Sequence, residues 1–268
     1  MKHWDKHDNF DAAEKKWDAS AKEAEDSNPL KILRHLPNMP GITSDTARNL
    51  KWKSLKYLVK HDEKRILPRH FFKHPIKYTQ AFIKSLLKNK PFTRDGDFFY
   101  YGVHDEDDFK EKIKSSEALI VIGFSYCHKP FECPSGRFTD NCIHDLASPV
   151  CKQCFIGKAV HALPSNVTIL YIPTIHYIGE KIFELTHNHP DKKIFFLITA
   201  CEMTLKMFGD WGNMVGARGI GVRLDGRICN TMHAFELSER GVKPGLTVVL
   251  DETQKRMLEL IKYIRTAV

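Results

Sequence analysis

Four apolar segments of strand length recur in the second half of this 268-residue chain. They are ALIVIGF (118–124), VTILYIP (167–173), KIFFLIT (193–199) and GIGVRL (219–224), and LTVVLD (246–251) is a fifth candidate. Strands that are apolar throughout are buried on both faces, as in a parallel sheet covered by helices. Helical patterns fall at 154–163, 178–188, 202–208 and 253–266. This alternation predicts an α/β fold with a Rossmann-like, mostly parallel sheet and flanking helices.

The chain before residue 92 has a different character. Residues 48–90 hold 13 Lys and Arg residues and two acidic residues. The excess of positive charge in this segment is larger than the net charge of +8 of the whole chain. Apolar residues recur at helical spacing near 50–59 and 76–88, and a further helix is expected within 10–25. We therefore expect a helical, basic N-terminal region at 1–91 and an α/β cysteine-rich metal-binding domain at 92–268. The basic helices could attract nucleic acid, but a solvated face is the favoured interpretation.

The sequence predicts a cytoplasmic protein. No segment approaches the ~20 apolar residues that a membrane span needs, so no transmembrane segment is expected. Residues 1–18 are charged and lack the apolar core of a secretory signal. In a reducing compartment, clustered cysteines bind metals or act in catalysis more often than they form disulfides.

Seven cysteines carry the candidate site, five of them with the spacing C-x5-C-x8-C-x8-C-x2-C. They are Cys127, Cys133, Cys142, Cys151, Cys154, Cys201 and Cys229. Cys127, Cys201 and Cys229 each come shortly after a predicted strand. The carboxyl ends of parallel strands share one edge of a sheet, and ligands bind there. We expect these three cysteines at that edge, with the CxxC pair Cys151 and Cys154 folded back onto it at the start of a helix.

Thiolate ligands select zinc, copper(I) or iron–sulfur clusters. A single CxxC with cysteines from distant strand ends is closer to iron–sulfur ligation than to structural zinc, which uses two closely spaced pairs. The prediction is a 4Fe–4S cluster held by Cys151, Cys154, Cys201 and Cys229, with the other three cysteines nearby and zinc as the alternative. A second metal could use three cysteines with His128 or His144. Each cysteine can also be a small buried hydrophobe.

Polar residues directly follow two of the cysteines. Glu202 comes after Cys201, and Asn230 and Thr231 come after Cys229. They are candidates for hydrogen bonds to metal ligands, and Glu202 for a general base; helix capping and a turn are equally good interpretations. The glycine-rich segment 209–221 is not a dinucleotide fingerprint, because it precedes a strand. Its glycines are expected to let the backbone approach a metal or small ligand.

Several motifs together resemble an uncharacterised, cysteine-rich family, domain of unknown function 116, over residues 117–250. They are Cys133-Pro134, CKQCFIGKAV (151–160), ITACEMTL (198–205) and GRICNTMHAFE (226–236), in the family's order. The resemblance implies a metal-binding protein without an established reaction and carries over Cys133, Cys151, Cys154, Cys201 and Cys229. Family members often have a third cysteine just after the CxxC, where this chain has Phe155 and Gly157.

Two functions remain open. The first is an iron–sulfur protein with a redox or Lewis-acid role toward an unidentified small molecule or redox partner. The second is a zinc-stabilised binding module whose basic helices, 48–90, contact nucleic acid or an acidic partner.

Overall fold

The computed structural model describes residues 42–87, 92–211, 216–226, 229–243 and 247–267, together with Ala19. The helix expected within 10–25 therefore lies outside the described residues. No helix among the described ranges is long and apolar enough to cross a membrane.

The fold is built on a six-stranded mixed sheet with the order β1-β2-β6-β5-β3-β4. The strands are β1 (Thr93–Asp95), β2 (Phe98–Tyr101), β3 (Ala118–Ser125), β4 (Thr168–Ile172), β5 (Lys193–Ala200) and β6 (Arg218–Arg223). β3, β4, β5 and β6 are parallel, and β1 and β2 add an antiparallel edge. The predicted α/β fold is confirmed, and the four apolar segments form its parallel strands.

One strand prediction needs correction. In the described part of the segment, 247–251, Thr247–Val248 forms β8, which pairs with β7 (Asp225–Gly226) in a separate two-stranded sheet. The helix α12 already begins at Asp251. The segment is apolar because it is buried beneath other elements and not because it is a strand of the main sheet.

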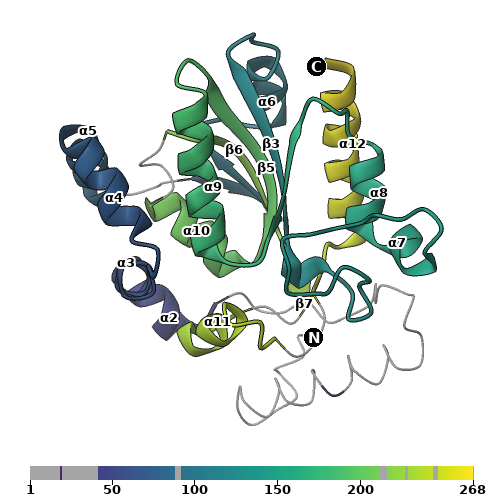
Figure 1. The fold of residues 1–268 in the computed structure, drawn as a ribbon, viewed down its shortest axis with the longest axis horizontal. Coiled ribbons are helices and arrows are strands. Elements are labelled where there is room, and N and C mark those ends of the chain that lie inside the picture. Colours follow the sequence, from purple (N-terminus) through teal and green to yellow (C-terminus); the bar gives the residue numbers. More distant parts are fainter. Residues whose placement is uncertain are drawn as a thin grey trace.

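Helices cover both faces of the sheet (Figure 1). α6 (Glu106–Lys112), α8 (Phe155–His161) and α12 (Asp251–Ala267) pack on one face, and α9 (Ile175–Asn188) and α10 (Glu202–Trp211) on the other. The remaining helices are α2 (Ser44–Arg48), α3 (Leu50–Lys60), α4 (Ile66–Lys73), α5 (Pro75–Leu87), α7 (Pro149–Gln153) and α11 (Met232–Ser238). In β5 every residue after Lys193 is buried, because helices lie on both sides. This double cover is why the strands read as unbroken apolar runs.

The described part of the N-terminal region is helical, as predicted, and packs against the α/β layers. Leu50 and Tyr57 of α3 share a hydrophobic cluster with Cys201, Met207 and Phe235. Figure 1 shows α2–α5 beside α10 and α11. These helices therefore lie over the carboxyl edge of the sheet, where Cys201 is located.

Two glycines within β6, Gly219 and Gly221, serve the packing of the sheet. A Cβ at Gly219 would lie 2.0 Å from the carbonyl oxygen of Phe196, and one at Gly221 would lie 2.4 Å from Leu205 Cδ2. The expectation that these glycines approach a ligand is wrong for both positions, because neighbouring strand and helix atoms occupy that space. Residues 212–215 of the same segment lie outside the described ranges.

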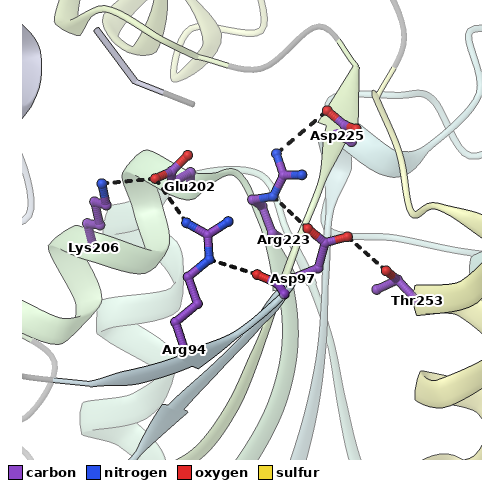
Figure 2. Close-up of polar contacts among 8 residues, drawn as sticks. Arg94, Asp97, Glu202, Lys206, Arg223, Asp225 and Thr253 are labelled. Atoms are coloured by element: carbon purple, nitrogen blue, oxygen red, sulfur yellow. Dashed lines mark hydrogen bonds and ion pairs between the residues drawn. The ribbon is translucent and has the colours of Figure 1, made fainter. Parts of the chain in front are cut away.

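An ionic network joins the β1–β2 turn to the end of β6 and to two helices (Figure 2). The Asp97 carboxylate accepts from Arg223 Nε at 2.8 Å and from Thr253 Oγ1 at 2.8 Å. Arg223 NH1 also lies 3.6 Å from Asp225 Oδ1. The side chains of Arg223 and Asp97 are 10% and 11% exposed, so each charge depends on the other for compensation.

Replacing Asp97 with Ala leaves the buried Arg223 guanidinium without its main partner, and this is expected to lower the free energy of unfolding by about 3 kcal/mol. Urea unfolding followed by circular dichroism measures the change. The control is Asp107→Ala, which removes a carboxylate that is 89% exposed and paired with Lys110; it should cost less than about 1 kcal/mol. Equal losses for the two variants would contradict a structural role of the network.

Candidate functional site

The candidate site lies at the topological switch point of the parallel sheet. β3 pairs with both β4 and β5, and the helices that follow β3 and β5 pack on opposite faces. Open α/β sheets bind ligands in the crevice formed where such connections diverge, at the carboxyl ends of the strands. The 3₁₀ turn η2 (Tyr126–His128) directly follows β3, and Cys201 directly follows β5. Topology alone therefore brings Cys127 and Cys201 to this crevice.

Three thiols meet there around a buried ammonium group, and we call them the rim thiols: Cys127, Cys201 and Cys229. Lys243 Nζ lies 3.1 Å from Cys127 Sγ and 3.7 Å from Cys229 Sγ. Cys201 forms a hydrogen bond with Cys229. All four residues are buried. The expected meeting of the three cysteines at the sheet edge is thus observed, and Lys243 is a member that sequence reasoning missed.

The rim thiols have different proton affinities. The hydrogen bond from Cys229 lowers the pKa of Cys201 to about 7; burial opposes this shift and the Lys243 ammonium supports it. The same hydrogen bond, together with burial, raises the pKa of the Cys229 thiol. Burial disfavours the charged form of Lys243, but negative charge on the rim thiols outweighs it and raises the lysine pKa. Of Cys201 and Cys229, Cys201 therefore carries negative charge more readily near neutral pH.

The other four cysteines form a second group, the loop thiols: Cys133, Cys142, Cys151 and Cys154. Burial raises the pKa of Cys142, and the charges of Cys133 and Cys151 raise it further. Burial also raises the pKa of Cys154 to about 11, with smaller contributions from Cys142 and Cys133. Because charge effects fade with distance, these causes indicate that Cys142 and Cys154 lie in the same part of the loop as Cys133.

A second buried lysine organises the loop that carries these thiols. Lys129 is 2% exposed, and its ammonium donates to the carbonyl oxygens of Asn141 at 2.6 Å and Thr139 at 2.9 Å. Arg137 links the loop of the loop thiols to the rim thiols, since its Nε donates to Lys129 O and its NH1 donates to Lys243 O. An ammonium caged by carbonyls fixes a loop that has no regular secondary structure of its own.

Backbone N–H groups oppose the effect of burial on two loop thiols. Those of Ile156 and Gly157, at the start of α8, lower the pKa of Cys154, and that of His144 lowers the pKa of Cys142. Tyr171 also hydrogen-bonds with Cys142. Donors of this kind stabilise a thiolate more than a neutral thiol. They match what a metal-bound sulfur requires, because hydrogen bonds to cluster sulfurs tune such centres.

Cys151 and Cys154 belong to α7 and its junction with α8, which packs on one face of the sheet, whereas Cys201 directly precedes α10 on the opposite face. The predicted meeting of Cys151 and Cys154 with Cys201 and Cys229 at one metal centre stays a prediction. All seven cysteines are free thiols. Within the described ranges, no group of three or more His, Cys, Asp or Glu residues is arranged to hold a metal ion.

The two candidate histidines lie on either side of the cysteine loop. His128 is buried, and neither ring nitrogen has a hydrogen-bond partner. Its ring stacks on Phe155 with centroids 5.1 Å apart, and burial lowers its pKa to about 4, so it is neutral. His144 Nδ1 lies 2.9 Å from the carbonyl oxygen of Cys142. Both are therefore near loop thiols, and His128 has unused ring nitrogens.

The three polar candidates have roles apart from the sulfurs. Glu202 pairs with Lys206 at 2.9 Å and Arg94 at 3.5 Å (Figure 2). Thr231 caps α11 by accepting from Ala234 N, so the capping interpretation holds for it. Asn230 is buried. Its backbone carbonyl oxygen accepts from Thr43 N at 3.0 Å, whereas its side-chain amide has no hydrogen-bond partner.

Comparison with known proteins identifies no relative of this chain. No family model, no curated protein and no solved structure matches this chain. The resemblance to domain of unknown function 116 therefore stays a prediction based on its motifs.

Gly157→Ala is expected to disturb the loop thiols. A Cβ at this position would lie 2.4 Å from the carbonyl oxygen of Cys151, so the corner between α7 and α8 would have to open, at a cost of about 1–3 kcal/mol. Urea unfolding measures this loss. The matched control is Gly179→Ala in α9, where nothing lies within 4 Å of the added carbon and a gain of up to about 1 kcal/mol is expected. Similar stability changes in the Gly157→Ala and Gly179→Ala variants would contradict the close packing of Gly157 against Cys151.

Alkylation by iodoacetamide should report the lowered pKa of Cys201. Because the thiolate is the reactive form, the rate at Cys201 is expected to reach half its maximum near pH 7, the value given by its pKa of about 7. Peptide mass spectrometry assigns the modified residue. Cys229→Ala removes the hydrogen bond and should move the midpoint to higher pH, while Cys229→Ser keeps a donor and should move it less. A midpoint that does not respond to Cys229→Ala would contradict this assignment.

Proposed function

We propose that this chain is a metal-binding protein whose centre is an iron–sulfur cluster held by the loop thiols Cys133, Cys142, Cys151 and Cys154. The proposal is supported by the charge effects of Cys133 and Cys151 on Cys142 and of Cys142 and Cys133 on Cys154, within a loop that the buried Lys129 holds in shape. Four cysteines are the usual complement of a 4Fe–4S cluster. This ligand set replaces the sequence-based one, in which Cys201 and Cys229 completed the site.

The chemistry of the donor set fits such a cluster. Four sulfur ligands suit a soft metal centre. A cluster also holds its thiolates farther apart than a single zinc ion does, so thiols that do not yet converge on one point need less movement to bind it. Metal sites are frequently completed only when the metal binds. Zinc in the same four thiols is the alternative.

The bound cluster would supply one-electron redox chemistry, or Lewis-acid chemistry if an iron position were open. The chain's own residues would set its surroundings. Lys129 keeps the loop in shape through its carbonyl contacts. The ring of His128, whose nitrogens have no hydrogen-bond partner, stacks on Phe155, the residue after Cys154. Arg137 connects this loop to Lys243 and hence to the rim thiols.

A nucleic-acid partner has less support. Part of the surface of α3–α5 is engaged with the α/β layers, as the Tyr57 and Leu50 contacts illustrate, and Lys64 pairs with Glu180 of α9 at 2.7 Å. The redox or small-molecule partner of the centre is not specified by these residues.

Anaerobic purification followed by iron, zinc and acid-labile sulfide analysis tests the proposal. The expected result is a brown protein with iron and sulfide in comparable amounts. The double variant Cys151→Ser/Cys154→Ser should lose the iron, whereas Cys201→Ser, which changes only a rim thiol, should keep it. Colourless protein with stoichiometric zinc would favour the zinc alternative, and loss of metal from Cys201→Ser alone would contradict the division of the cysteines into two groups.

A further inference from the structure

A cavity of about 980 Å³ lies between the N-terminal helices and the α9–α10 face of the sheet. Protein interiors are close-packed, with few voids larger than a water molecule, and pockets for small molecules measure roughly 300–1,000 Å³. This space is therefore too large to be a packing defect. Its walls come from α3, α4, α5, α9 and α10, and its base comes from the carboxyl ends of the strands.

The lining changes character from the helices to the strand ends. Along the helices it is apolar, with Leu58, Phe71 and Phe82 on one side and Ile178 and Phe183 on the other. Hydrogen-bonding groups gather at the strand ends, where Ser125, Thr199, Glu239 and the rim thiols face the space. The occupant that fits such a lining has a long apolar part and one polar end.

The charges around the cavity exclude polyanionic ligands. Arg65 is the only Lys or Arg among the described residues that line it, and this residue is exposed to solvent. A nucleotide or a sugar phosphate would need several cationic or N–H donors. Glu239, whose Oε2 accepts from Ile175 N at 2.8 Å, has its pKa raised by burial to about 8. This carboxyl is therefore mainly neutral near pH 7 and does not repel an acidic or carbonyl end group.

A glycine in the middle of α9 keeps part of the cavity open. Gly179 lines the space, and nothing lies within 4 Å of the position that its Cβ would take. Glycine inside a helix costs about 1 kcal/mol relative to alanine. No neighbouring atom would clash with a side chain at position 179. The effect of the glycine is therefore to leave that part of the cavity empty.

We propose that this cavity binds a long-chain acyl group, with the chain between α3–α5 and α9 and the polar end at the rim thiols. The rim offers several hydrogen-bonding groups, among them the buried Thr199 and Cys201, whereas the charged residues on the outer side are Asp62, whose carboxylate accepts from Ile66 N and Leu67 N, and the exposed Arg65. Binding here does not depend on metal at the loop thiols, which lie outside the lining. A free fatty acid and a fatty ester share the chain chemistry, and they differ at the polar end.

Fluorescence titration of the full chain with cis-parinaric acid, an eighteen-carbon polyene fatty acid, tests the proposal. Saturable binding of one probe per chain is expected, displaced by palmitate and at least about tenfold less well by octanoate, whose shorter chain buries less apolar surface. Displacement by methyl palmitate as well as by palmitate would assign an ester, and displacement by palmitate alone would assign a free acid. Absence of saturable binding to the wild-type chain would overturn the proposal.

Matched variants at one position link binding to the cavity. Gly179→Leu directs a side chain into the open space and should weaken probe binding by at least about tenfold, while Gly179→Ala should stay within about twofold. Arg65→Ala should also stay within about twofold if the polar end faces the rim. Circular dichroism confirms that each variant is folded. Unchanged binding by folded Gly179→Leu would overturn the site, and a tenfold loss in Arg65→Ala would overturn the orientation.

Protection of a rim thiol supplies an independent readout. Bound palmitate should slow the alkylation of Cys201 by at least about fivefold, because Cys201 lines the cavity. The alkylation of Cys133, a loop thiol outside the lining, should be unaffected. Equal rates at Cys201 with and without saturating palmitate would overturn the placement of the ligand beside the rim thiols.

Discussion

The contact between the Lys243 ammonium and the rim thiols is the interaction on which the rest of the site depends. Moving an ammonium group out of water costs several kcal/mol unless an opposite charge compensates it. Here Cys127 Sγ lies 3.1 Å and Cys229 Sγ 3.7 Å from the ammonium, and Cys201, whose pKa is lowered to about 7, supplies the opposite charge. The lysine thus favours a thiolate, and the thiolate favours a charged lysine, so the cluster stays charged inside a largely apolar setting.

The winding of the sheet determines what this charged cluster faces. Because the connections after β3 and β5 leave on opposite faces, the strand ends open between them. On one side the loop after β3 carries four further thiols and a second buried ammonium, Lys129. On the other side the N-terminal helices and α9 enclose the apolar cavity. The rim thiols therefore lie between a candidate metal centre and a candidate ligand pocket. Arg137 joins the loop of the candidate metal centre to the rim by donating to the backbone carbonyl oxygens of Lys129 and Lys243.

Much of the fold could be predicted from the sequence, because apolar strands and the helices between them leave strong local patterns. The meeting of Cys127, Cys201 and Cys229 also followed from strand ends alone. The packing of α8 and α10 on opposite faces of the sheet did not, since it depends on tertiary contacts that leave no local pattern. Lys243 and Lys129 carry no sequence signal, because a lysine in a turn is normally solvated. The cavity was equally hidden, as it arises from how α3–α5 dock on the α/β layers.

Disulfide mapping of the oxidised, metal-free protein tests the division into two thiol groups most directly. After mild treatment with diamide and proteolysis, mass spectrometry identifies which cysteines have become linked. The account predicts a Cys201–Cys229 bond at the rim and, separately, bonds only among Cys133, Cys142, Cys151 and Cys154 in the loop. A dominant bond between Cys151 or Cys154 and Cys201 or Cys229 would contradict it, because those sulfurs would then share one site.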